Sequence, residues 1–141
     1  MIVFSQQEAI EYMNNKGRAG KPFLFIINYK AHTIHLYEPN EVDSTELLYD
    51  LNGFTNSSYT EENKQKPEWE TEPVPYSVYE KAFRYVTNEI KAGNSYLLNL
   101  TFPTKVTTNL TLKSIFLQAK ASYKLWLKDQ FVCFSPEIFV R

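Results

Sequence analysis

The chain has 141 residues, of which 43% are hydrophobic and 16% aromatic, and this composition excludes an intrinsically disordered protein. Fifteen Lys and Arg residues oppose sixteen Asp and Glu residues, for a net charge of -1, so we exclude a protein that holds nucleic acid on a basic surface. The length suits one domain, and we expect residues 1–141 to form a single domain.

The sequence also indicates the cellular compartment in which the protein is expected. Cys133 is the one cysteine, so no disulfide can form within the chain, and its apolar neighbours predict a buried thiol. No stretch approaches 18 apolar residues, and the N-terminus lacks the pattern of a signal peptide. We therefore expect a cytoplasmic protein that does not enter a membrane.

The first half of the chain predicts one helix and three strands. Ser5 and Glu8 have the spacing of a capping box, which predicts that a helix begins there, and Gly17 can end it. Residues 22–30 are apolar on both faces, as in a central strand, and residues 33–37 alternate like a strand with one wet face. Residues 46–52 predict a third strand of the same antiparallel meander.

Residues 53–75 are polar and acidic and contain three prolines, so they predict a long loop. Trp69 is the large apolar side chain of this segment, and we expect it to attach the loop to the body of the protein.

The second half begins with the clearest helix. Ser77 and Glu80 have the spacing of a second capping box, and Gly93 suits the end of the helix. Its apolar stripe is expected to pack in the core and comprises Tyr79, Ala82, Phe83, Val86 and Ile90.

The remaining pattern completes the expected fold. Residues 96–102 alternate like a strand, residues 110–121 predict a short helix, and residues 123–135 predict a hairpin. Together the elements predict an α+β fold, with an antiparallel sheet and helices packed on its outer faces.

Local patterns show no catalytic or metal site. His32 and His35 are the only histidines, and three residues apart on a strand they point to opposite faces, so they cannot share a metal. The four glycines form no phosphate-binding loop, and Cys133 has no suitably placed base.

Three stretches nevertheless resemble a known family. They are EIKAGNSYLLNLT (89–101), AKASYKLWL (119–127) and FSPEIFVR (134–141). In order and spacing they resemble segments of the chorismate-utilising enzymes, specifically component I of aminodeoxychorismate (para-aminobenzoate) synthase and of anthranilate synthase. The resemblance implies that the chain is the N-terminal part of this fold and of a longer enzyme.

The resemblance also implies roles for single residues. Asn28, Tyr29, Ser122 and Tyr123 fall where relatives form an amino-acid pocket that can hold tryptophan. The proline-containing frame of that pocket is replaced by other residues here, so we expect tryptophan to bind weakly or not at all.

A second group of residues matches motif positions for which we expect a structural role. These positions are Asn99, Ser135, Pro136 and Glu137. Asn99 in particular is expected to satisfy neighbouring backbone groups.

The function implied by the resemblance belongs to the longer enzyme. That enzyme would convert chorismate, with ammonia from a glutamine amidotransferase partner, to 4-amino-4-deoxychorismate for para-aminobenzoate and folate synthesis, and it would use Mg2+. In the family the catalytic and metal-binding residues come after the third stretch, so we expect the 141 residues to be inactive and to bind no metal.

Two alternatives stay open: component I of anthranilate synthase in tryptophan biosynthesis, and a non-catalytic binding or interaction domain. The resemblance also implies that strands of the longer enzyme complete the sheets of this part, so we expect strand edges that lack their neighbours to make the chain self-associate.

Overall fold

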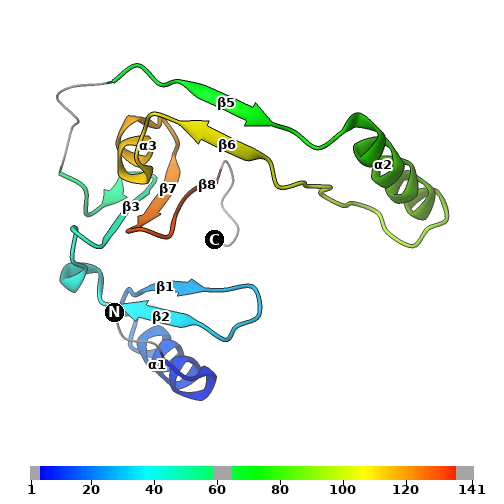
Figure 1. Ribbon diagram of the computed structural model, residues 1–141. Coiled ribbons are helices and arrows are strands. Elements are labelled where there is room, and N and C mark those ends of the chain that lie inside the picture. Colours follow the sequence, from blue (N-terminus) through cyan, green and yellow to red (C-terminus); the bar gives the residue numbers. More distant parts are fainter. Residues whose placement is uncertain (1–3, 59–64, 136–141) are drawn as a thin grey trace. The chain divides into compact units, whose positions relative to one another are not determined.

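The structure is a computed structural model that describes residues 4–58 and 65–135 (Figure 1). It divides into two compact units. The first unit comprises Met1–Asn63 and Leu112–Arg141, and the second unit comprises Lys64–Thr111. Helices and antiparallel strands occur in both units, which confirms the α+β class. The single-domain assignment of residues 1–141 stays a prediction.

A helix and a two-stranded sheet form one part of the first unit. Helix α1 (Gln6–Arg18) has the predicted capping box, in which the Glu8 amide donates to Ser5 Oγ at 3.3 Å and the Ser5 amide donates to Glu8 Oε2 at 2.9 Å. Strands β1 (Leu24–Ile27) and β2 (Ile34–Tyr37) pair antiparallel. The helix packs on β2, and the buried cluster comprises Ala9, Ile34 and Leu36.

A four-stranded antiparallel sheet forms the other part of the first unit, in the order β4-β3-β7-β8. Its strands are β3 (Leu47–Leu51), β4 (Phe54–Thr55), β7 (Tyr123–Leu127) and β8 (Phe131–Ser135). Helix α3 (Leu112–Gln118) packs on β7 and β8, and the core between them comprises Leu48, Phe116 and Trp126. The hairpin predicted near the C-terminus is confirmed as β7–β8.

The second unit is a two-stranded ribbon with a helix between its strands. Strands β5 (Trp69–Glu72) and β6 (Lys105–Thr108) pair from Trp69 with Thr108 to Glu72 with Lys105. Helix α2 (Tyr76–Lys91) lies between them in sequence. A hydrogen bond from the Glu68 amide to Asn109 Oδ1, at 3.0 Å, fixes one end of the ribbon.

The capping box predicted at Ser77 and Glu80 is wrong. The helix begins at Tyr76, and Pro75 is its N-cap residue without a side-chain hydrogen bond. The Pro75 carbonyl accepts from the amides of Val78 and Tyr79, which places Ser77 inside the first turn.

Strand pairing also differs from the sequence-based expectation. The predicted three-strand meander is wrong, because β3 pairs with β4 and β7 rather than with β2, after the 3-10 helix η1 (Pro39–Glu41) turns the chain. The predicted loop 53–75 contains β4 and β5, and residues 96–102 form no strand. The alternating residues 96–102 therefore do not belong to a sheet. The strand of this region that pairs with β5 is β6, which begins at Lys105.

Two further residues are more exposed than the sequence predicts, and both lie on strands that other elements cover only in part. Cys133 is exposed on β8, which is an edge strand, although desolvation of the thiol raises its pKa. Trp69 is half exposed on β5 and does not attach a loop to a core. No helix in the described part of the chain is long and apolar enough to cross a membrane.

Candidate functional site

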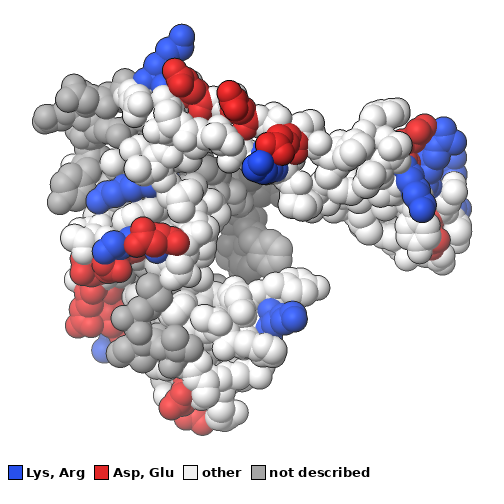
Figure 2. Space-filling view, viewed as in Figure 1, with Lys and Arg blue, Asp and Glu red and all other residues white. Residues whose placement is uncertain are grey.

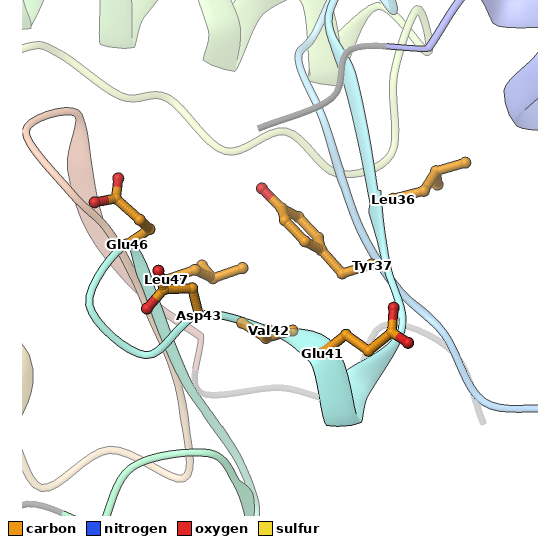
Figure 3. Close-up of a pocket in the computed structure, with 7 residues that line it drawn as sticks. All are labelled: Leu36, Tyr37, Glu41, Val42, Asp43, Glu46 and Leu47. Carbon is orange, nitrogen blue, oxygen red and sulfur yellow. The ribbon is translucent and has the colours of Figure 1, made fainter.

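A cavity of about 340 Å³ lies where the chain passes from β2 to β3 (Figure 3). Its walls are lined by Leu36, Tyr37, Glu41, Val42, Asp43, Glu46 and Leu47. Pro39 begins η1, because its fixed φ suits a tight turn directly after a strand. The Asp43 carboxylate then accepts from the Thr45 amide at 2.8 Å and from the Thr45 hydroxyl at 2.7 Å, which shapes the entry into β3.

Tyr37 provides an unusual polar group in this cavity. Its ring extends from β2 toward the segment that carries Glu46 and Leu47 (Figure 3). The hydroxyl oxygen is buried and has no hydrogen-bond partner among the described residues. Desolvation raises the pKa of this phenol, so it remains a neutral donor at physiological pH.

The carboxylates around the cavity are largely engaged by other groups. Hydrogen bonds from Thr45 hold the pKa of Asp43 below its usual range. Glu46 pairs with Lys128 Nζ at 2.6 Å, and this contact raises the pKa of Lys128. An ionised Asp43 cannot act as a general acid near neutral pH.

The carboxylates at this cavity can be compared with the ligand group that a metal ion needs. No group of three or more His, Cys, Asp or Glu side chains in the described ranges is placed to hold a metal ion. Two of the three carboxylates that line the cavity already have partners, because Asp43 accepts from Thr45 and Glu46 pairs with Lys128.

The first predicted pocket residues lie at the turn between β1 and β2. Asn28 Oδ1 accepts from the amides of His32 at 2.9 Å and Thr33 at 3.1 Å, so Asn28 closes the turn. Tyr29 lies on the same turn and is fully exposed. A smaller cavity of about 160 Å³ includes Asn28 and lies beside the β7–β8 turn.

The other predicted pocket residues lie at the start of β7. The Ser122 carbonyl accepts from the Asn52 amide at 2.6 Å, and Tyr123 pairs with Leu51 in the sheet. Neither residue lines the cavity that contains Asn28, nor does Tyr29. The structure does not bring the four residues together in that cavity, and their role in an amino-acid pocket stays a prediction.

The motif residues with an expected structural role are partly described. Asn99 is exposed in the segment between α2 and β6. Ser135 is the last residue of β8 and pairs with Tyr123. Pro136 and Glu137 lie outside the described residues, so the structural role of this group stays a prediction.

Sequence reasoning missed the cavity at Tyr37. The segment 39–46 is a turn-rich link in the sequence, with carboxylates at Glu41, Asp43 and Glu46. The concentration of acidic residues between two strands was the available signal. The position of the Tyr37 ring across the link was not visible, because it depends on the turn made by η1.

Comparisons with known proteins give the family. The chorismate binding enzyme family matches residues 4–141. An uncharacterized PabA-like protein of Haemophilus influenzae is 39% identical over 142 residues, covering 100% of this chain and 43% of the relative. An uncharacterized PabA-like protein of Pasteurella multocida is 37% identical over 133 residues, covering 94% of this chain and 41% of the relative.

These matches also show how much of each relative's length the chain spans. The chain spans less than half the length of these two relatives, and no solved structure matches it. The family match covers nearly the whole chain and agrees with the resemblance carried by the three sequence stretches. The chain belongs to the family of chorismate binding enzymes.

Proposed function

We propose that the chain is part of component I of an aminodeoxychorismate synthase, which replaces the ring hydroxyl of chorismate by an amino group and releases water. The observation that carries this proposal is the match of the chorismate binding enzyme family over residues 4–141. Both relatives are named PabA-like, which favours the para-aminobenzoate branch over anthranilate synthesis.

The proposal assigns the chemistry to polypeptide beyond the matched region. The chain covers 43% of the Haemophilus influenzae relative, so more than half of that relative lies outside the match. The described residues show no group of three or more His, Cys, Asp or Glu side chains placed to hold a metal, and two carboxylates at the Tyr37 cavity are engaged, Asp43 by Thr45 and Glu46 by Lys128. In this proposal the rest of a longer protein holds Mg2+ and the chorismate ring, and a glutamine amidotransferase supplies the ammonia.

In this arrangement the 141 residues contribute scaffold rather than catalysis. The Tyr37 phenol supplies a neutral donor and Asp43 an anion, and an ionised Asp43 cannot donate the proton that loss of a hydroxyl group requires. We infer that the chain by itself does not convert chorismate.

A product assay tests the proposal. The complete reading frame that encodes these residues is expressed and supplied with chorismate, Mg2+ and ammonium, in parallel with the 141-residue chain. We expect 4-amino-4-deoxychorismate from the complete protein and no chorismate loss above buffer with the chain. Formation of anthranilate would reassign the branch. A reading frame that stops after residue 141, with no turnover, would favour the non-catalytic domain.

A further inference from the structure

The second unit has no buried core. None of the described residues 65–111 is buried, whereas the first unit has two clusters of buried side chains. The large apolar side chains exposed in the second unit are Trp69, Tyr76, Val78, Tyr79, Phe83, Tyr85, Ile90, Tyr96, Leu97, Leu98 and Val106. Such a set on a unit of this size marks a surface that another polypeptide covers.

Helix α2 concentrates this apolar surface. At 3.6 residues per turn, its apolar side chains occupy about half of the helix circumference. Going around that half, they are Tyr85, Val78, Ala82, Val86, Tyr79, Ile90, Phe83 and Tyr76, and we call this set the apolar arc. Most charged residues of α2 lie on the opposite half, and Figure 2 shows the charged side chains of this helix gathered beside an uncharged surface.

Contacts within the second unit cover little of the apolar arc. Tyr79 stacks on Phe83 with ring centroids 5.9 Å apart, and Phe102 meets Tyr79 at 6.0 Å. Phe83 is still 51% exposed and Tyr85 is 67% exposed. A helix of this length is marginal in water, and so is a two-stranded ribbon, so the unit needs a partner to be stable.

The width of the apolar arc points to the kind of partner. Two copies that pair as a coiled coil bury a narrow seam of two positions in seven. An arc of about half the circumference is typical of a helix that several elements cover in the core of a globular protein. The first unit already has its own clusters, and its exposed apolar side chains are scattered over several elements.

We propose that the apolar arc of α2 is a docking face for the part of the chorismate binding polypeptide that lies outside this chain. The inference rests on the proposed function only in assuming a longer parent enzyme. The size of the partner supports it, because 57% of the Haemophilus influenzae relative lies outside the match, which is enough polypeptide for a second core.

The test measures amide hydrogen exchange by mass spectrometry on the complete 141-residue chain. The added partner is the portion of the Haemophilus influenzae relative outside its match to this chain. In the chain by itself, at a concentration where it is monomeric, we expect α2 amides to exchange with little protection. With the added portion, we expect them to slow by about tenfold or more, because docking must be undone before they open.

Two variants make the test specific to the apolar arc. Phe83→Ser removes a half-exposed aromatic ring of the arc, and Arg84→Ser changes its exposed neighbour on the opposite half. We expect Phe83→Ser to abolish the added protection and Arg84→Ser to retain it. Exchange in β7 and α3 reports on the first unit and should be the same in both variants, which shows that neither substitution unfolds that unit.

Three results would overturn the proposal. They are strong protection of α2 in the monomeric chain, protection that rises only with the concentration of the chain and thus reflects a second copy, and no protection on adding the relative's portion. None of these readouts depends on product chemistry. If the complete protein made anthranilate while docking persisted, the proposed function would fail and this inference would stand.

Discussion

Replacing Phe116 by alanine tests whether the first unit has the core that the structure describes. Phe116 is fully buried between α3 and the four-stranded sheet, in contact with Leu48 and Trp126. A buried phenylalanine removes about 150–250 Å² from water, which corresponds to roughly 4–6 kcal/mol at about 25 cal/mol per Å². Core substitutions of this type cost about 3–5 kcal/mol in practice, and we adopt that range for Phe116→Ala.

The neighbouring lysine should not compensate for this loss. Lys124 Nζ donates to the carbonyls of Phe116 and Ala119, each at 3.0 Å, and lies 4.7 Å from the centre of the Phe116 ring. The substitution leaves both carbonyl contacts possible but removes the ring, so a cation–π interaction of about 0.5–2 kcal/mol is lost with the packing.

Urea unfolding followed by Trp126 fluorescence measures the effect, in a Trp69→Phe background that leaves one tryptophan. Phe134→Ala is the matched control, because this phenylalanine lies on β8 of the same sheet but is exposed, and we expect a cost below about 1 kcal/mol. A cost for Phe116→Ala equal to that of the control would refute the described core.

Three further predictions concern the turn, the pH dependence and the amino-acid pocket. Asn28→Ala removes the acceptor of two turn amides and should lower the free energy of unfolding by about 1 kcal/mol, whereas exposed Tyr29→Ala should have no effect; urea midpoints compare them. Lys16 and then Tyr12 hold the pKa of Glu38 below its usual value of 4.5, so this contribution to stability is present above that pH and is lost as the pH falls through the lowered pKa. Glu38→Gln should therefore flatten the acid side of the stability profile, as measured by urea midpoints from neutral to acid pH. Free tryptophan should show no micromolar binding in calorimetry, because Asn28 and Ser122 are held at separate turns by backbone hydrogen bonds.

The features that sequence predicted correctly depend on nearby residues. The capping box of Ser5 and Glu8 and the β7–β8 hairpin both form between positions close in the chain, so their patterns were sufficient. The box at Ser77 failed because the Pro75 carbonyl begins the helix earlier. Two residue types can have the right spacing while a neighbouring backbone group determines the first turn.

The features that sequence missed depend on distant residues. Trp69 pairs with Thr108, and β3 pairs with β7, so both pairings join segments that are far apart in the sequence. The residues of one strand do not indicate which distant strand it pairs with. The same holds for the cavity, where the turn of η1 brings Tyr37 over the link that carries Glu46. The family, by contrast, was evident from the order of three short stretches and was confirmed by the match over residues 4–141.

The most direct test of the central claim follows pyruvate in the chorismate reaction. Conversion of chorismate to 4-amino-4-deoxychorismate keeps the enolpyruvyl group, whereas anthranilate formation releases it as pyruvate. The complete protein is incubated with chorismate, Mg2+ and ammonium, and pyruvate and the aminated product are measured in the same sample. The account predicts an aminated product without stoichiometric pyruvate, and none from the 141-residue chain. Pyruvate released in step with chorismate loss, or turnover by the chain by itself, would contradict it.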